Sequence, residues 1–201
     1  MAQYIGTTVI TSVVAGTNCS GGGTSGTVTV DVDDAFLVND ANDTTSGTIT
    51  AAGFTTTGIV DAAIRKFTPT GTTTDGTVTG GDVVYFGGTT SMTAGAIYHY
   101  KSDGTWELAD ADAVATSDGL LAVALGAASD TNGMCLRGMV TIDHDPGAIG
   151  DVLFLSTTAG DCSATAPSGS ADVVRVIGYQ VNHASSGAIW FCPDGTYVEL
   201  A

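Results

Sequence analysis

The sequence predicts an all-β protein, an antiparallel sandwich or barrel-like domain, and three observations support that fold class. Thr and Val recur along the whole chain, and both favour the half-buried pleated surface of a sheet. Gly numbers 28 and Pro only 4 among 201 residues, which suits a chain with many turns. Short apolar runs alternate with turn residues at the spacing that is typical of a β-sandwich or barrel.

The strongest turn signal occurs twice. Residues 96–109 have the sequence AIYHYKSDGTWELA, and residues 188–201 have the sequence AIWFCPDGTYVELA. Both place Asp-Gly between aromatic and β-branched residues, which indicates a β-hairpin because tight primed turns need backbone angles that Asp and Gly accept. We therefore expect a degenerate repeat in which the same hairpin is used twice.

Residues 1–67 form the first expected region, a Thr/Gly-rich β arm for attachment or oligomerisation. Residues 27–33 alternate Val with Thr or Asp, which predicts a strand with one solvated face. The expected elements are a strand at 3–14, a flexible turn or linker at 20–26, a strand at 27–33, a strand pair at 47–57 and a short helix at 61–67.

A Gly/Thr-rich segment, 68–80, is the expected linker to a compact β domain at 81–201. Gly-Asp-Val begins an apolar run at Gly81 and again at Gly150. The two Gly-Asp-Val runs lie closer together than the two hairpin sequences, which predicts an insertion that includes residues 156–172. Strands are expected at 82–86, 96–100, 105–108, 120–125, 134–142, 152–155, 173–181, 188–192 and 197–200.

The charge of the chain excludes some partners. The net charge is −16, from 21 acidic and 5 basic residues. Nucleic acids and anionic membranes are bound through clustered Lys and Arg, so neither is expected here. Residues 1–16 lack a basic segment and a cleavage site, and the longest apolar run, 120–125, is too short to cross a bilayer. We expect no signal peptide or transmembrane segment, and synthesis in the cytoplasm. The five basic residues are Arg65, Lys66, Lys101, Arg137 and Arg175.

The four cysteines show no C-x-x-C pairing, so zinc binding by them is not expected. Their spacing is compatible with free buried or half-buried thiols, the preferred interpretation, and also with a disulfide. The four are Cys19, Cys135, Cys162 and Cys192.

The most suggestive polar cluster is Asp143-His144-Asp145. A carboxylate beside a histidine can orient it for base catalysis or metal binding. Adjacent residues on a strand point to opposite faces, and Pro146-Gly147 follows, so we favour a solvated turn in which the three side chains do not converge.

Other acidic residues are also expected in turns. An acidic stretch could coordinate calcium, but it lacks the spacing, the central Gly and the terminal Glu of an EF-hand, and exposed strand and turn positions are preferred. Asp110 and Asp112 are expected to line a loop. The acidic stretch comprises Asp31, Asp33, Asp34, Asp40 and Asp43.

Nothing nominates an enzyme. Gly-x-Ser-x-Gly is absent from the sequence, and neither His99 nor His183 has a local partner that indicates a triad. Gly21-Gly22-Gly23 is not followed by the Lys and helix of a phosphate-binding loop. We expect no catalytic, cofactor-binding or metal-binding residues and no cofactor. The aromatic residues Tyr98, Trp106, Trp190, Phe191 and Tyr197 are expected to pack across strands rather than to form a carbohydrate platform.

About 120 residues of the C-terminal two-thirds resemble virion structural proteins of tailed bacteriophages, in particular head-decoration and head- or tail-fibre proteins. The resemblance is carried by GDVVYFG (81–87), GLLAVALG (119–126), GMCLRGMVTI (133–142), the segment 150–181 and the closing AIWFCPDGTYVEL. The segment SGTITAAGFTTTG (46–58) resembles, more weakly, the Thr/Gly-rich strands near the N-termini of fibre proteins.

The resemblance implies a non-enzymatic β protein that oligomerises, commonly as a trimer, on the virion. The leading expectation is a capsid decoration or cement protein that binds the major capsid protein and stabilises the head. The alternative is a head- or tail-fibre protein for host adsorption, with the loops at Asp103-Gly104 and Asp194-Gly195 as candidate contacts. A glycan-processing enzyme, which needs converging carboxylates, is the least favoured.

Overall fold

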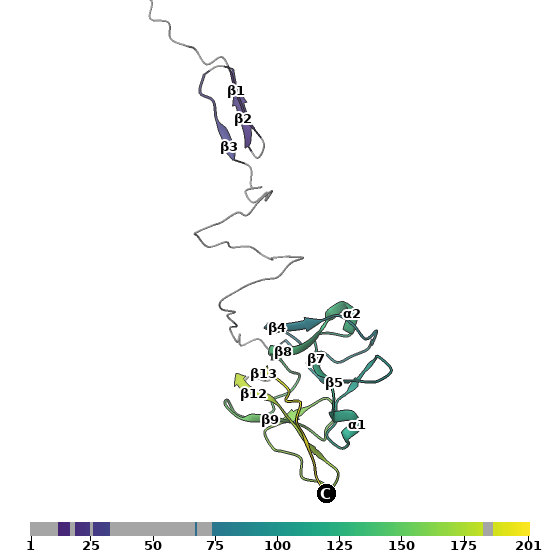
Figure 1. Ribbon diagram of the computed structural model, residues 1–201. Helices are drawn as coiled ribbons and strands as arrows, with labels where there is room; N and C mark the ends of the chain where they lie inside the picture. The colour runs from purple at the N-terminus through teal and green to yellow at the C-terminus, as the bar shows by residue number, and fades with distance from the viewer. Residues whose placement is uncertain (1–11, 17–18, 25, 33–66, 68–73, 183–186) are drawn as a thin grey trace, which may run out of the picture. The chain divides into compact units, whose positions relative to one another are not determined.

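The computed structural model describes residues 12–16, 19–24, 26–32, 67, 74–182 and 187–201 (Figure 1). The chain divides into two units, Met1–Val60 and Asp61–Ala201. Every strand pair in the described part is antiparallel, and the two helices have four residues each. The all-β prediction is therefore confirmed. Neither helix is long or apolar enough to cross a membrane.

The first unit contains a three-stranded sheet, β1 (Val13–Val14), β2 (Cys19–Gly23) and β3 (Val30–Val32), in that order. The prediction of a flexible turn at 20–26 is wrong for residues 20–23, which form most of β2. Gly21 and Gly22 have φ values of 96° and 109°. A Cβ on Gly21 would meet the carbonyl oxygen of Thr29, just before β3, and a Cβ on Gly22 would meet that of Val13 in β1. Glycine here therefore permits close strand approach as well as turning.

The predicted strands at 3–14 and 27–33 are confirmed only in part, as β1 and β3, because the described residues 12 and 27–29 are not in strands. The strand pair at 47–57 and the helix at 61–67, apart from Phe67, lie outside the described residues. So does segment 68–73 of the expected linker. Residues 78–80 of that linker belong to a strand of the second unit, so the sheet begins before the predicted domain boundary at residue 81.

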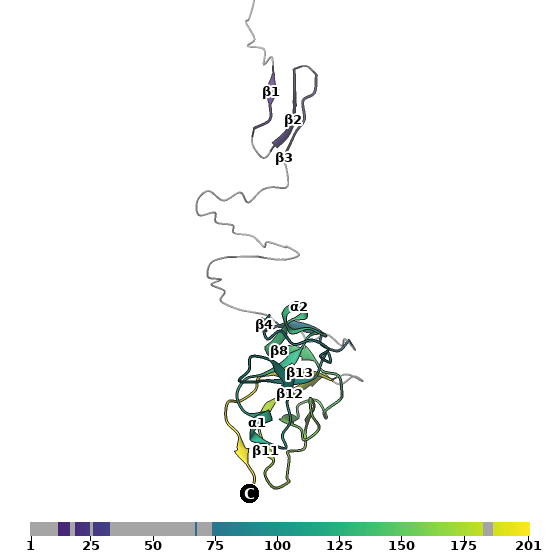
Figure 2. The same ribbon diagram turned by 90° about the vertical axis from the view of Figure 1, so that its right-hand side faces the viewer.

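The second unit is built on a nine-stranded sheet that curls on itself (Figures 1 and 2). Its order is β10-β9-β12-β13-β8-β7-β5-β6, and β4 pairs with β8; β11 and β14 form a separate pair. The strands are β4 (Val78–Val84), β5 (Ile97–Tyr100), β6 (Trp106–Leu108), β7 (Leu121–Ala124), β8 (Met134–Thr141), β9 (Val152–Leu155), β10 (Cys162–Ser163), β11 (Val173–Val174), β12 (Val176–Asn182), β13 (Ala188–Phe191) and β14 (Val198–Glu199), with helices α1 (Val114–Ser117) and α2 (Ser129–Asn132).

Strand β8 is the branch point of the sheet. Its first residues pair with β7 and its last with β13, while β4 pairs along nearly its whole length. Gly81 pairs with Gly138, and a Cβ on either would meet the backbone of the other strand. The two strands therefore approach through glycines, and their register shifts twice, as expected where a sheet bends sharply.

The sheet buries side chains on both faces, with the period of two that a strand imposes. Along β7, Leu121 and Val123 belong to one core cluster, and Ala122 and Ala124 belong to the other. The larger cluster includes Ile97, Leu153, Ile177, Ile189 and Phe191, all fully buried. Burial on both faces explains why this strand appears in the sequence as an uninterrupted apolar run.

Each of the nine strands predicted in the second unit corresponds to a strand of the structure. The prediction that residues 188–201 form a hairpin is wrong. β5 and β6 pair as a hairpin across the Asp103-Gly104 loop. β13 instead pairs with β12 and β8, and β14 pairs with β11. The predicted strand 173–181 is divided into β11 and β12 at Arg175.

Candidate functional site

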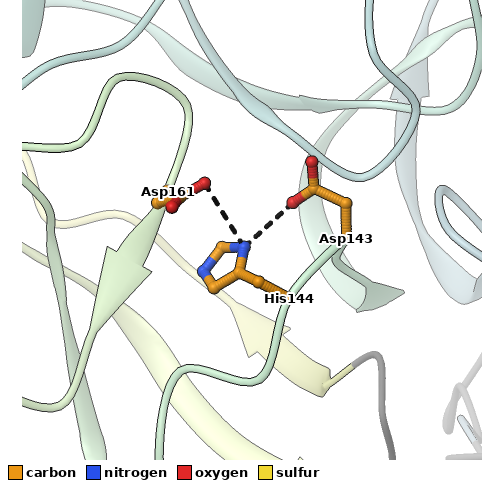
Figure 3. Close-up of side chains that lie close together, drawn as sticks. All are labelled: Asp143, His144 and Asp161. Atoms are coloured by element: carbon orange, nitrogen blue, oxygen red, sulfur yellow. Dashed lines mark hydrogen bonds and ion pairs between the residues drawn. The ribbon is translucent and has the colours of Figure 1, made fainter.

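Three polar side chains meet at the end of the sheet, from two segments far apart in the sequence (Figure 3). Asp143 and His144 lie two and three residues after the end of β8 at Thr141, and Asp161 immediately precedes β10. We call these three residues the His144 cluster. One ligand atom from each lies within 4.8 Å of the others.

Both carboxylates approach the same ring nitrogen of the histidine. Nδ1 of His144 lies 2.9 Å from Oδ1 of Asp143 and 3.5 Å from Oδ1 of Asp161. The side chains are partly buried, with 22% of His144, 21% of Asp143 and 35% of Asp161 exposed. An ion or a water molecule can therefore reach the cluster from solvent.

The other ring nitrogen faces the main chain. Nε2 of His144 lies 3.0 Å from the carbonyl oxygen of Cys162 and 3.1 Å from its amide nitrogen. When Nδ1 carries the proton, Nε2 accepts from the Cys162 amide; when Nε2 carries it, Nε2 donates to the Cys162 carbonyl. Nε2 therefore has a backbone partner in both tautomers. In the tautomer with the proton on Nε2, the Nδ1 lone pair is directed at the two carboxylates.

The surroundings shift the pKa values of two groups in the cluster. Burial lowers the pKa of His144, but its hydrogen bond to Asp143, the charge of Asp161 and the Cys162 carbonyl together raise it above its usual value. Burial raises the pKa of Asp161, and the charge of Asp143 adds to that rise although His144 opposes it. The cluster is a place where negative charge is crowded and cations are favoured.

The prediction that Asp143, His144 and Asp145 do not converge is wrong for the first two residues. Both lie beyond the last residue of β8, where the alternation of a strand no longer applies. Asp145 does not join the cluster, and its place is taken by Asp161. The sequence carried no signal for Asp161, because three strands separate β10 from β8 in the sheet order, and only the curl of the sheet brings the two segments together (Figure 1).

A second histidine is held between carboxylates in a different way. His99 is on β5, with 8% of its side chain exposed, and its two ring nitrogens have separate partners. Nδ1 lies 3.1 Å from Oε1 of Glu107, and Nε2 lies 3.3 Å from Oδ1 of Asp118. Both ring nitrogens therefore have a carboxylate partner, and Glu107 is the cross-strand neighbour of His99.

The remaining candidates behave as surface or loop residues where the structure describes them. Asp31 lies in β3, whereas Asp33, Asp34, Asp40, Asp43 and His183 lie outside the described residues. Asp110 and Asp112 line the loop between β6 and α1 as predicted, and the amide of Asp112 donates to Oδ1 of Asp110. Gly21, Gly22 and Gly23 are part of β2.

The cysteines are free thiols, as preferred from their spacing. Burial raises the pKa of Cys135 to about 12 and also raises those of Cys162 and Cys192. A thiol with a raised pKa carries little thiolate at neutral pH, so these three cysteines are poor nucleophiles.

Of the aromatic residues predicted to pack across strands, Trp106 does so, against its β5 partner Tyr100. The ring centroids of Tyr100 and Trp106 are 4.8 Å apart, and Phe86 packs on both rings. Trp106 also donates its indole N–H to the Phe86 carbonyl. Trp190 has different neighbours, Phe67 and the guanidinium of Arg137.

A groove of about 560 Å³ lies on the second unit. Its apolar lining includes Leu120 and Tyr179, whose exposed fractions are 39% and 44%. Arg175, also in the lining, donates to the carbonyl oxygens of Ser117, Gly119 and Asp194. Its guanidinium therefore joins three loops and is engaged by backbone.

No protein-family model, curated protein or solved structure matches the chain.

Proposed function

We propose that the chain is a non-enzymatic structural component of a tailed phage particle, a capsid decoration protein that binds the head surface and stabilises it. The proposal rests on the resemblance of residues 81–87, 119–126, 133–142, 150–181 and 188–200 to such proteins. The curled antiparallel sheet supports it, because a rigid β unit can present a constant surface at every site on a shell.

The structural observation that supports a binding role is the groove beside Leu120 and Tyr179. Exposed apolar side chains around a hollow are what a protein-contact surface requires, since association buries them. Leu136, Val176 and Pro193 extend the apolar lining. The chemistry of the groove supports binding rather than catalysis. The guanidinium of Arg175 already donates to backbone carbonyls, and the raised pKa of Cys192 makes its thiol a poor nucleophile.

The proposed partners are the major capsid protein and further copies of this chain, most simply as a trimer. Residues 1–67 would supply an arm, with segment 3–14 pairing to a neighbouring sheet edge. Symmetric copies multiply weak contacts through avidity, so each site can be weak while the assembly is firm. Deletion of residues 1–16 should then reduce binding to capsids, and unchanged binding would remove the arm from the proposal.

Quantitative mass spectrometry of purified particles, combined with antibody labelling, tests the location. We expect a copy number comparable to that of the major shell protein and label distributed over the head. A few copies restricted to the tail or one vertex would overturn decoration.

A variant tests the groove. Leu120→Asp combined with Tyr179→Asp places two charges in the apolar lining, and we expect capsid binding to weaken at least tenfold. Ile149→Asp, at a side chain that is 64% exposed and outside the groove lining, should bind as the parent does. Equal binding by both variants would exclude the groove as the contact.

The alternative, a fibre protein for host adsorption, is favoured by one observation. A hollow of about 420 Å³ adjoins the β5–β6 loop and is lined mainly by polar groups, among them His99, Lys101, Asp103 and Glu107. Such groups suit hydrogen bonding to a glycan. Replacing Lys101 and Asp103 with Ala should abolish attachment to host cells if adsorption is the function, and should leave capsid binding intact if decoration is.

A further inference from the structure

We propose that Asp143, His144 and Asp161 form a binding site for a divalent transition-metal ion of the zinc class. The ion would link the end of β8 to the loop before β10. This inference does not depend on the proposed virion function, because it concerns the chemistry of three side chains.

The distances suit a single shared ion. Bonds of about 2.0–2.2 Å to nitrogen and oxygen in a tetrahedral site place neighbouring ligand atoms roughly 3.3–3.5 Å apart. Nδ1 of His144 lies 2.9 Å and 3.5 Å from the two carboxylate oxygens, and all three atoms lie within 4.8 Å of one another. The three ligand atoms are therefore close enough to share one ion.

The arrangement of charge also favours a cation. Two carboxylates face one nitrogen of His144, and a single N–H proton cannot satisfy both well. His99 provides the contrast, since Glu107 and Asp118 face opposite nitrogens and each obtains its own donor when the ring is protonated. The His144 cluster therefore concentrates ligand atoms at one point, whereas the carboxylates of His99 are separated by its ring.

The contact behind the histidine is the one that metal-binding histidines use. Such a histidine donates its second ring N–H to a carbonyl or carboxylate, which fixes the tautomer and directs the free lone pair at the ion. The Cys162 carbonyl, 3.0 Å from Nε2 of His144, fills this role. It comes from the segment that also carries Asp161, so one loop supplies a ligand and orients another.

The backbone holds both sides of the site. The amide of Gly187 donates to the carbonyl of His144, and that of Ile142 donates to the carbonyl of Gly187. On the other side, the amide of Ile97 donates to the carbonyl of Gly160, and that of Ser156 donates to the carbonyl of Asp161. The ligands are thus positioned on segments anchored to the sheet, which lowers the conformational entropy that binding must overcome.

The ligand set indicates the class of ion. Calcium and magnesium prefer oxygen ligands alone, whereas an imidazole nitrogen suits zinc and its neighbours in the first transition series. Three protein ligands leave a fourth position for water.

Zinc titration of the full chain after treatment with EDTA tests the site. We expect calorimetry at pH 7 to detect a zinc site, and thermal unfolding to shift upward by roughly 5–10 °C when free zinc is about a hundredfold above Kd. Both effects should disappear in Asp161→Asn and in His144→Gln. Asp145→Asn, next to the cluster but outside it, should retain both effects.

The outcomes separate the site from any other zinc-binding group in the chain. Zinc binding that persists in Asp161→Asn would overturn the proposal, as would the absence of zinc stabilisation in the parent. Stabilisation by calcium and not by zinc would overturn the assigned class. Circular dichroism checks that each variant folds. If His144→Gln does not fold, Asp161→Asn tests the zinc site alone, because Asn is isosteric with Asp and the side chain at this position is partly exposed.

Discussion

The segments 96–109 and 188–201 share Ala-Ile-aromatic at the start, Asp-Gly-Thr in the middle and Glu-Leu-Ala at the end, yet they fold differently. In the first, β5 and β6 pair with each other across the loop. In the second, β13 pairs with β12 and β8, and the end of the chain leaves to pair with β11. Like sequences thus occupy unlike positions in one unit.

The local structure of the shared Asp-Gly-Thr is nevertheless similar. Oδ1 of Asp103 accepts from the amide of Thr105 at 3.0 Å, and Oδ1 of Asp194 accepts from the amide of Thr196 at 2.9 Å. This is the short-range bond by which Asp favours turns. The backbone differs beyond it, since Gly104 has a φ of 83° and Gly195 has no positive φ.

The space available beside each strand explains the divergence. One edge of β5 pairs with β7, and the other accepts β6. Both edges of β13 are already occupied, by β12 and β8, so the last residues of the chain cannot return alongside it. A turn sequence can reverse the direction of the chain, but the two flanking segments form a hairpin only where the first of them has a free edge for pairing.

Two sequence differences fit this outcome. Pro193 stands where the first segment has Lys101, whose amide donates to the Thr105 carbonyl at 2.9 Å and closes the hairpin. Asp-Gly also comes one residue earlier after Ala-Ile in the second segment, and a change of one residue reverses the face on which later side chains lie.

The largest expected effect concerns the strand that is enclosed on both edges. Phe191 is fully buried, and Phe191→Ala should reduce the free energy of unfolding by about 3–5 kcal/mol. Leu108→Ala, on the edge strand β6 at a side chain that is 40% exposed, should reduce it by about 1 kcal/mol or less. Urea unfolding measures both, and equal losses would contradict the contrast between an enclosed and an edge strand.

Substitutions that exchange Lys101 and Pro193 between the two segments should have the next largest effect on stability. Lys101→Pro removes the closing hydrogen bond of the first hairpin and should cost about 1–3 kcal/mol. Pro193→Lys should change stability by less than about 1 kcal/mol, because the β12 carbonyls are bonded by the amides of Cys192 and Asp194, on either side of residue 193. A large gain from Pro193→Lys would mean that proline alone prevents the second hairpin. Chemical denaturation of the two variants decides this.

The Glu of the shared Glu-Leu-Ala should matter in the first segment alone. Glu107→Gln weakens the contact with Nδ1 of buried His99 and should cost about 1 kcal/mol. Glu199→Gln alters an exposed residue of β14 and should leave stability within about 0.5 kcal/mol of the parent. Similar values for the two would show that the His99 contact contributes nothing.

The smallest effect is a titration in the first loop. Bonds from Thr105 and Lys101 lower the pKa of Asp103 to about 2. A lowered carboxyl pKa stabilises the fold at pH values above the unfolded pKa, near 4, and that stabilisation is lost as the pH falls towards 2. Nuclear magnetic resonance should find the low pKa in the parent and a higher one in Thr105→Val. An unshifted Asp103 in the parent would show that the loop bonds do not persist in solution.

The candidate site shows how far sequence patterns reach. Asp143-His144 was identifiable as an adjacent pair, but the expectation of a strand separated its side chains, whereas the chain has left β8 at that point. Asp161 was not identifiable, because β10 is separated from β8 by three strands in the sheet order, and the two segments meet only because the sheet curls (Figure 1). His99 and Glu107 belong to a hairpin, and their pairing follows from its register.

The sequence by itself determined the features that depend on neighbouring residues. Val, Thr and aromatic runs produced strands, Asp-Gly-Thr produced the same short-range bond twice, and alternating burial followed from the period of a strand. Only the tertiary structure decided which sheet edge was open to each strand and which distant carboxylate reached His144. Those outcomes depend on which strands become neighbours in the sheet. Neighbouring strands come from segments far apart in the chain, and a local pattern of residues carries no information on that arrangement.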